Sequence, residues 1–298
     1  MKKVLFGTTA LVLSAGVAFA DAHAGVSISG SAAAGIAATG LGDDNTAAGG
    51  ENHLADELYV YNEVELDFTL SGTSDNGLTF GASVDLNAGT GFDLGDDEFD
   101  HNGGTAGLGS VFISGDFGTL TFDEDGTDDL YDDDNSHDLL YEYDMGDISL
   151  AVTYDLDGDG IDSEMSASIG YSDGALSLGL TGNDGDTADG GLVADLGYTV
   201  SDSLSVSLSH DMPAVGDDVT TLGAVFSSGP LTLDGEVDTA DGWALGVTYS
   251  AGATTLSAST DDADEWEVTT SYDLGGGLSI EAGMNYNDSM FLGAAMSF

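Results

Sequence analysis

The sequence has almost no positive charge. Lys2 and Lys3 are its only lysines or arginines, against 55 aspartates and glutamates, and the formal net charge is −53 at pH 7. Proteins bind nucleic acid largely by neutralising its phosphates with lysine and arginine. The composition therefore excludes nucleic acid and other polyanions as partners, and it favours association with cations.

Cysteine is absent, and only 2 prolines occur in 298 residues. Stability therefore comes from the architecture of the chain and not from disulfide bonds. After residue 24 the sequence also lacks any run of about 18 apolar residues that would predict a transmembrane helix. The 45 glycines are instead typical of many short strands joined by tight turns.

The residue patterns of an enzyme are missing as well. The histidines His53, His101, His137 and His210 are scattered and do not have the spacing of metal ligands. There is no cysteine nucleophile, and acidic pairs are too frequent in this chain to indicate a glycosidase. The sequence predicts a protein that is not an enzyme.

The first residues have the pattern of an export signal. Lys2 and Lys3 precede an apolar stretch that ends at Ala18 and Ala20, a small-residue cleavage pattern. We expect residues 1–20 to be a signal peptide and residues 21–298 to form one domain. Because every acidic residue follows residue 20, removal of the signal would take the formal charge from −53 to −55.

Apolar and polar residues alternate with period 2 from residue 25 onward, as in β-strands with one apolar face. No comparable stretch has the period of a helix. Counting hairpins predicts 18 strands. The expected strands are 26–38, 58–70, 78–86, 109–115, 119–123, 139–145, 148–156, 165–171, 176–180, 192–200, 204–210, 222–226, 231–237, 243–249, 254–260, 266–274, 278–286 and 290–298.

The two faces of these strands differ in charge. In residues 58–70, for example, Leu66 and Phe68 share one face while Glu65 and Asp67 share the other. In a transmembrane barrel the apolar face contacts lipid and the acidic face lines water. Aromatic residues gather near strand ends, as they do in the two interfacial girdles of such barrels.

The connections between strands alternate in length. Short glycine-rich connections such as 116–118 and 275–277 alternate with longer acidic ones such as 40–56 and 88–105. Short turns at one end and long loops at the other are typical of a barrel that stands upright in a membrane. We therefore predict an all-β fold, a transmembrane antiparallel up-and-down β-barrel.

The last strand carries an apolar face to the end of the chain. In a closed barrel the last strand pairs with the first, so we expect residues 290–298 to pair with the strand that begins near Val26. The residues of this C-terminal face are Met290, Leu292, Ala294, Met296 and Phe298.

Three stretches resemble the Gram-negative general-diffusion porins of alphaproteobacteria, the Rhodobacter type. They are FTLSGTSDNGLTFGAS at residues 68–83, VFISGDFGTL at 111–120 and SYDLGGG at 271–277. Their order and the terminal Phe298 also agree. The resemblance implies a homotrimeric outer-membrane channel for passive diffusion of small hydrophilic solutes and ions. It implies that the C-terminal strand is the signal read by the barrel-assembly machinery.

The resemblance further implies 16 strands, where the hairpin count favours 18, and an inward constriction loop after the fifth strand, at residues 124–138. We interpret its acidic residues as a carboxylate ring that concentrates cations. The competing interpretation is a solvated acidic surface loop. The residues are Glu124, Asp125, Asp128, Asp129, Asp132, Asp133, Asp134 and Asp138.

Carboxylates of the pore wall follow from strand alternation, because they lie opposite apolar neighbours. In related porins, arginines of the wall face the acidic residues of the inward loop. This chain has no lysine or arginine after Lys3, so it cannot form that arrangement. We therefore expect a cation-selective pore. The predicted wall residues are Glu63, Glu65, Asp67, Asp85, Glu142, Asp195, Asp234, Glu236, Glu265, Glu267 and Glu281.

Residues 155–162 resemble the first half of a calcium loop, with oxygen ligands at alternate positions in Asp155, Asp157, Asp159 and Asp162. The bidentate glutamate of such a loop is missing, so an acidic hairpin loop is the competing interpretation. We expect no required cofactor and at most weakly bound Ca²⁺ or Mg²⁺. Such cations would also bridge the loops to outer-membrane lipid and lipopolysaccharide, which are anionic.

Two other functions are compatible with these patterns. A substrate-specific outer-membrane channel would have an aromatic track in its lumen, whereas the predicted lumen faces carry mainly serine, threonine, glycine and acids. A secreted acidic calcium-binding β-protein would lack the alternation of short and long connections.

Overall fold

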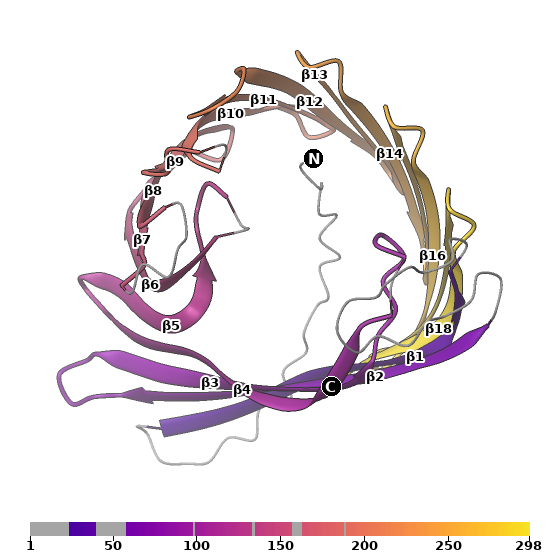
Figure 1. Cartoon of the computed structure of the whole chain (residues 1–298), viewed down its shortest axis with the longest axis horizontal. Coiled ribbons are helices and arrows are strands. Elements are labelled where there is room, and N and C mark those ends of the chain that lie inside the picture. Colours follow the sequence, from indigo (N-terminus) through magenta and orange to yellow (C-terminus); the bar gives the residue numbers. More distant parts are fainter. Residues whose placement is uncertain (1–23, 40–57, 98, 133–134, 157–162, 188) are drawn as a thin grey trace.

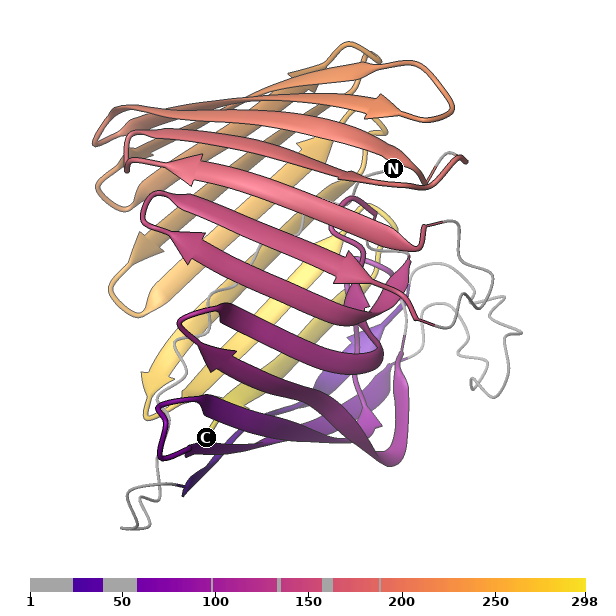
Figure 2. The ribbon, with the colours of Figure 1, turned by 90° about the vertical axis from the view of Figure 1, so that its left-hand side faces the viewer.

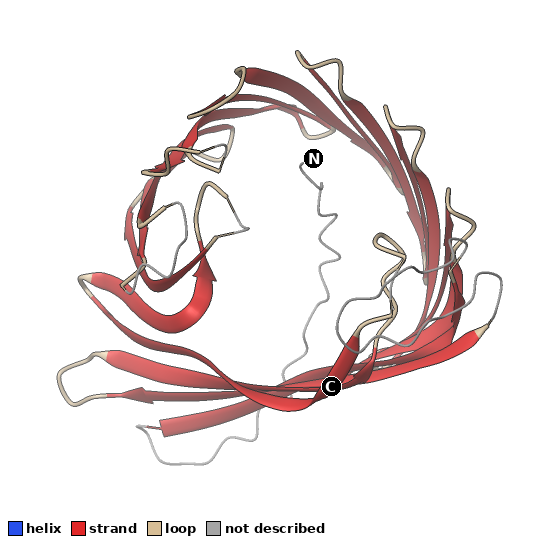
Figure 3. Cartoon of the chain, in the orientation of Figure 1, coloured by secondary structure: helices blue, strands red, loops and turns tan. Residues whose placement is uncertain are grey.

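The computed structural model describes residues 24–39, 58–97, 99–132, 135–156, 163–187 and 189–298. In this part of the chain eighteen strands form one antiparallel sheet that closes into a barrel (Figure 1, Figure 3). No helix among these residues is long and apolar enough to cross a membrane. The strands are β1 (Ala24–Ala38), β2 (Tyr59–Thr73), β3 (Thr79–Thr90), β4 (His101–Gly115), β5 (Gly118–Asp128), β6 (Ser136–Met145), β7 (Ile148–Tyr154), β8 (Met165–Ser172), β9 (Leu176–Asn183), β10 (Gly191–Ser201), β11 (Leu204–Pro213), β12 (Val219–Ser228), β13 (Leu231–Asp238), β14 (Trp243–Ala251), β15 (Thr254–Asp261), β16 (Trp266–Gly275), β17 (Leu278–Asn285) and β18 (Met290–Ser297).

The barrel closes at β1, which pairs with β2 on one side and with β18 on the other. Ile36 of β1, for example, lies between Val60 of β2 and Leu292 of β18. The predicted pairing of the last strand with the first is confirmed. The hairpin count of 18 is confirmed as well, and the 16 strands implied by resemblance do not apply to this chain.

The outer surface of the barrel is apolar. Side chains such as Val60 and Leu108 are 73% and 75% exposed, and the buried hydrophobic residues of the described chain are few. Exposing a side chain of this size to water costs about 1.5–3 kcal/mol, and contact with hydrocarbon removes that cost. The surface therefore fits a lipid environment. The buried hydrophobic residues are Ala37, Ala38, Tyr61 and Leu94.

Short turns lie at one end of the barrel and longer connections at the other (Figure 2). In the β16–β17 turn, Gly275, Gly276 and Gly277 have φ angles of 82°, 68° and 82°. Residues with a side chain rarely adopt this left-handed conformation, which explains the three glycines. The chain ends at the same end of the barrel, where the backbone N–H of Phe298 donates to the carbonyl of Gly30 at 2.9 Å.

Two connections at the opposite end fold into the barrel. They are the β3–β4 loop, described over residues 91–97 and 99–100, and the β5–β6 loop, described over residues 129–132 and 135. In Figure 1 they lie inside the ring of strands, on opposite sides of it. The lumen, and not a packed apolar core, is therefore where the chain brings distant polar residues together.

Candidate functional site: the lumen and its inward loops

The predicted wall carboxylates share the inner face of the barrel. The Tyr131 hydroxyl of the β5–β6 loop donates to Oδ1 of Asp211 on β11 at 2.7 Å, which identifies the face of β11 that looks into the lumen. Residues paired directly across a ladder lie on the same face, so the register carries this assignment around the barrel. On this face lie Glu63, Glu65, Asp67, Asp85, Glu142, Asp195, Asp234, Glu236, Glu267 and Glu281.

Glu265 is the exception among the predicted wall residues. It precedes β16 and lies at the rim, where its Oε1 accepts a hydrogen bond from the Tyr286 hydroxyl at 2.9 Å. This bond stabilises the neutral phenol and is the main reason why the pKa of Tyr286 is raised above its ordinary value. Alternation alone assigned Glu265 to the pore wall, because alternation does not show where the hydrogen-bonded ladder begins.

The inner carboxylates are densest on β2 and β3. Asp67 and Asp85 are directly paired, and Glu65 lies two residues from Asp67 on the same face. The Ser31 hydroxyl donates to Oε2 of Glu65 at 3.2 Å, and Nδ2 of Asn87 donates to Oε1 at 3.5 Å. The side chains that donate hydrogen bonds to this patch are therefore neutral, since the chain has no lysine or arginine after Lys3. Such a patch produces a negative potential in the lumen.

The loop predicted as a constriction, at residues 124–138, is shorter than the sequence indicated. Strand β5 runs to Asp128, so Glu124, Asp125 and Asp128 belong to a strand, and Asp138 lies in β6. The β4–β5 ladder ends at the pair of Val111 with Phe122, while β5 pairs with β6 again at Thr127 after a register shift. The end of the β5–β6 hairpin thus leaves the wall and curls inward (Figure 1). Polar residues suit this strand segment because it does not contact lipid.

Asp129 holds the β5–β6 loop together. Its side chain is buried, and its Oδ1 accepts from the backbone N–H groups of Tyr131 at 2.7 Å and Asp132 at 3.3 Å. Its Oδ2 accepts from Nδ2 of Asn183 on β9 at 3.0 Å. Backbone and amide N–H groups thus compensate the desolvation of the carboxylate. Asp129 is therefore a structural hub of the loop and does not face an open pore, unlike the exposed Asp128.

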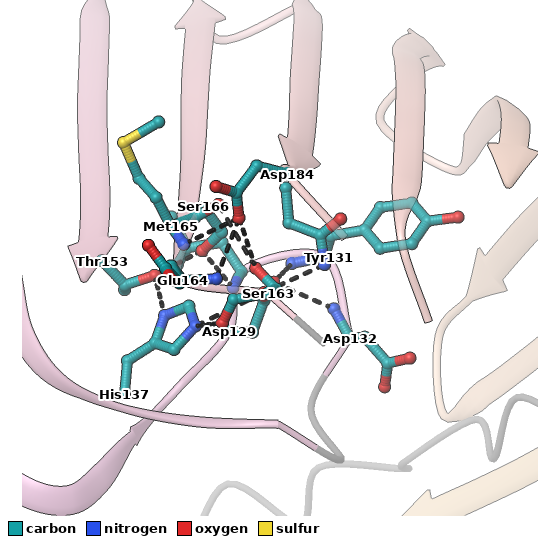
Figure 4. A network of polar contacts seen from close by, with 12 residues as sticks. Asp129, Tyr131, Asp132, His137, Thr153, Ser163, Glu164, Met165, Ser166 and Asp184 are labelled. Atoms are coloured by element: carbon teal, nitrogen blue, oxygen red, sulfur yellow. Dashed lines mark hydrogen bonds and ion pairs between the residues drawn. The ribbon is translucent and has the colours of Figure 1, made fainter. Parts of the chain in front are cut away.

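His137 joins the same network from the start of β6 (Figure 4). The ring is fully buried, and its Nε2 lies 3.0 Å from the Ser163 carbonyl and 3.7 Å from Oδ2 of Asp129. A carbonyl can only accept, so Nε2 carries a proton. In the neutral ring, Nδ1 accepts from the Thr153 hydroxyl at 2.6 Å. The histidine therefore connects the loop to β7 and to the segment before β8.

The β5–β6 loop is also tied to β8 and β11. The backbone N–H of Leu130 donates to the Ser166 hydroxyl at 2.8 Å, and Tyr131 reaches Asp211. Burial, and next the hydrogen bond to Asp211, raise the pKa of Tyr131 above the ordinary phenol value. A Cβ atom on Gly191 of β10 would meet the Tyr131 hydroxyl, so this position needs glycine for the ring to lie there.

The β3–β4 loop carries aromatic residues into the lumen, which the sequence reading did not predict. The Phe92 ring lies 6.3 Å from Tyr61, 4.9 Å from Phe99 and 6.2 Å from Phe291, and Phe99 lies 5.8 Å from Tyr59. The prediction that the lumen faces carry mainly small and acidic residues is therefore wrong on this side of the barrel. The rings form one compact cluster of a loop against the wall.

The sequence matches the family model of Gram-negative porins over residues 7–126 and 123–290, which is nearly the whole chain. The chain belongs to the Gram-negative porin family. It is similar in structure to a triple mutant of the Rhodopseudomonas blastica porin, with 15% sequence identity and a TM-score of 0.55. A second mutant of the blastica porin has 12% identity and the same TM-score of 0.55.

A porin structure refined at 1.8 Å resolution has 22% identity to this porin and a TM-score of 0.52. Each of these three alignments covers 92% of this chain and 100% of the other. At these identities the structures establish the shared barrel fold alone. A comparison with curated protein sequences gives no match.

The remaining predicted residues of the porin fall into two groups. The C-terminal face lies in β18 except for Phe298, which follows the strand, and Leu292 and Met296 pair with Ile36 and Ala32 on the outer side of β1. Of the predicted cation ligands, Asp155 is buried and its N–H donates to the carbonyl of Glu164 at 3.0 Å. Asp157, Asp159 and Asp162 lie outside the described residues, as do Asp133 and Asp134 of the loop. Within the described chain, no three acidic, histidine or cysteine side chains group as metal ligands would.

Sequence reasoning missed the residues that hold the inward loops. Asn183 and Asp211 could have been predicted in part, because both occupy alternate positions that face the lumen in their strands. Phe92, Leu94 and Phe99 were the stronger signal. Three large apolar residues in an acidic connection are unexpected in a loop surrounded by water, and they indicate that the loop packs against something.

Proposed function

We propose that this porin is an outer-membrane diffusion channel with a strong preference for cations. One observation carries the proposal. Acidic side chains lie on the inner face from β2 around the barrel to β17, and the chain has no lysine or arginine after Lys3. Solutes would cross by passive diffusion through a water-filled lumen, without any chemical step. The carboxylates raise the local concentration of cations and repel anions.

The electrostatic argument also predicts how selectivity depends on salt. The Debye length is about 10 Å at 0.1 M salt and about 3 Å at 1 M. At low salt the fields of the wall and loop carboxylates therefore extend into the lumen, whereas at high salt each carboxylate acts only nearby. The preference for cations is then largest in dilute salt and declines as the salt concentration rises.

Reversal potentials in a KCl gradient test this proposal. The expected permeability ratio of K⁺ to Cl⁻ is well above one and falls with rising salt, and anion selectivity would refute it. A triple variant, Glu65→Gln, Asp67→Asn and Asp85→Asn, removes the densest wall patch and is expected to lower the ratio. Asp202→Asn, in the exposed β10–β11 turn, is the matched control and is expected to leave the ratio unchanged.

A substrate-specific channel is the second candidate, and the aromatic cluster in the lumen is the observation that favours it. Tyr61, however, is only 6% exposed, and the rings pack on one another. The cluster therefore acts chiefly as an anchor for the β3–β4 loop. Saturable block of the ion current by a neutral oligosaccharide would favour the specific channel instead. The secreted calcium-binding protein is excluded by family membership.

The same proposal includes the cellular setting of the porin. A signal peptide at residues 1–20 would export the chain, and the barrel-assembly machinery would insert it as a homotrimer. We also propose that divalent cations bridge the acidic loops to lipopolysaccharide, because no lysine or arginine of the mature chain is available to meet its phosphates. The melting temperature in lipopolysaccharide-containing micelles is then expected to fall when a chelator is added at fixed ionic strength. An unchanged melting temperature would contradict this bridge.

A further inference from the structure

The β3–β4 loop crosses the inner wall instead of continuing away from the barrel. Its base is closed by two backbone hydrogen bonds between Gly91 and Asp100, at 2.9 and 3.2 Å. Its contacts begin at β2 and extend to β18 and β17, and β2, β1 and β18 lie between β3 and β17 in the sheet. With strands about 4.8 Å apart, this is a distance of about 19 Å along the wall. The loop is therefore an inward element in the same sense as the β5–β6 loop.

Apolar packing fixes one side of the β3–β4 loop. Phe92 contacts Tyr61 and Phe291, and Leu94 is 7% exposed. Leu94 and Phe291 occupy the space that a Cβ atom on Gly283 of β17 would need. These wall residues all have lumen-facing register positions. Few other apolar side chains of the described porin are as well buried, so the packing is specific to this contact.

Asn285 fixes the other side. It is 2% exposed and lies at the end of β17, 191 residues from Leu94 in the sequence. Its Nδ2 donates to the Leu94 carbonyl at 2.7 Å and to Oδ1 of Asp97. Its Oδ1 accepts from the N–H groups of Asn287 and Ser289, both at 3.1 Å. One half of the amide thus holds the loop, while the other half holds the β17–β18 turn.

The two inward loops share this design. Asn183 donates to Asp129 of the β5–β6 loop and accepts from the N–H of Gly191 at 2.9 Å, as Asn285 does for its own loop and turn. Both asparagines are the last residues of their strands. In a chain without lysine or arginine in its strands, an amide supplies the donor that an acidic loop needs without adding positive charge to the lumen.

From this geometry we infer that the β3–β4 loop is a second constriction element of the pore, opposite the β5–β6 loop, and that Asn285 is its positioning residue. The inference rests on the proposed channel function. Solutes then pass between two acidic loops, since Asp93, Asp96 and Asp97 lie on one side, and Asp132 and the exposed Asp128 at the end of β5 lie on the other. The width of the passage depends on both loops remaining in place.

The substitution Asn285→Asp tests the positioning role. A carboxylate at position 285 still accepts from Asn287 and Ser289, so the β17–β18 turn is preserved. It cannot donate to Leu94 or Asp97, and it places a second negative charge beside Asp97. In planar bilayers we expect a state of higher conductance, in which the loop has left the wall. This state is expected to be about tenfold or more populated than in the unaltered porin, the factor that corresponds to about 1.4 kcal/mol. The size limit for entry of neutral polyethylene glycols is expected to increase.

Two further variants separate pore width from charge. Thr248→Asp adds the same charge to the lumen-facing side of β14, which lies three strands from β17 and from β11 in the sheet, and it is expected to leave the polymer size limit unchanged. The exchanged pair N285D/D97N lets the amide at position 97 donate to the carboxylate at position 285. Its conductance is expected to move back toward that of the unaltered porin, which a merely unstable turn would not do.

A shortened loop, with residues 92–99 replaced by two glycines between Gly91 and Asp100, provides the decisive measurement if Asn285→Asp fails to form a heat-modifiable barrel. It is expected to widen the pore in the same way. If the unaltered porin conducts, and neither variant changes conductance or the polymer limit, the inference is overturned. If the unaltered porin forms no conducting pore, the proposed function itself is wrong.

Discussion

Removing the hydrogen bond between Tyr131 and Asp211 tests how the acidic β5–β6 loop is held inside an acidic barrel. Tyr131→Phe removes one hydroxyl and leaves the ring over Gly191. The bond measures 2.7 Å and has a carboxylate acceptor in a half-buried setting. Hydrogen bonds to charged groups contribute about 1.5–3 kcal/mol, so the open state of the loop is expected to become about ten to a hundred times more populated.

Limited proteolysis reports this opening directly. Trypsin cannot cut the chain beyond Lys3, because Lys2 and Lys3 are its only lysines or arginines, whereas chymotrypsin cleaves after tyrosine and phenylalanine alike. Cleavage after residue 131 requires the loop to leave its contacts, and its rate follows the population of the open state when reclosing is fast. Fragment masses identify the cut. Tyr131→Phe is expected to accelerate this cleavage about tenfold or more in detergent micelles.

Tyr286→Phe is the matched control. It removes a hydroxyl that also donates to a carboxylate, Glu265, at 2.9 Å, but at the rim beside β16 and β17. It is expected to leave cleavage after residue 131 unchanged. If Tyr131→Phe is cleaved within twofold of the rate of the unaltered porin, the bond to Asp211 does not hold the loop and the reasoning fails.

The phenol also predicts a pH dependence. Because the folded protein raises the pKa of Tyr131, its contribution to loop stability is fully present below about pH 10, the ordinary phenol value. It is lost as the pH rises through the raised pKa. Tyrosine ionisation can be followed by absorbance as the pH rises. The absorbance difference between the unaltered porin and Tyr131→Phe is expected at a higher pH than the ionisation of the other phenols. A difference centred near pH 10 would contradict the assignment.

Two other predictions concern the short-turn end of the barrel. Asp173 accepts hydrogen bonds from the backbone N–H groups of Leu176 at 2.8 Å and Ala175 at 3.1 Å, and these bonds lower its pKa. Its contribution is therefore present above the ordinary aspartate pKa of about 4 and is lost as the pH falls through the lowered value. In thermal unfolding from pH 7 to pH 2, the melting temperature of Asp173→Ala is expected to be below that of the unaltered porin at neutral pH and equal to it at the acid end. A difference in melting temperature that does not depend on pH would refute this. Deletion of Phe298 removes the N–H that bonds to Gly30 together with the terminal aromatic ring. It is expected to reduce the assembled fraction much more than the conductance of assembled channels, and normal insertion would show that the residue is not an assembly signal.

The sequence by itself determined the barrel. Alternation with period 2, glycine-rich turns at one end and an apolar last strand predicted the strand number and the closing pair of β1 with β18. These are local signals, because each strand of a membrane barrel contacts lipid on one face and water on the other whatever its partners are. The same alternation also indicated which carboxylates share one face, and the ladder register puts the predicted wall residues from Glu63 on β2 to Glu281 on β17 on one face, with Glu265 as the exception.

Only the tertiary structure decided where the connections go. Nothing local distinguishes a long acidic loop in solvent from one that folds into the lumen, because the difference depends on contacts 54 residues away for Asp129 and Asn183, and 191 residues away for Leu94 and Asn285. The boundaries of β4 and β5 changed for the same reason, since strands that leave the lipid no longer need an apolar face. Closure of the barrel brings these residues together, and only then do two asparagines, a buried histidine and a tyrosine supply the donors that this nearly cation-free chain lacks.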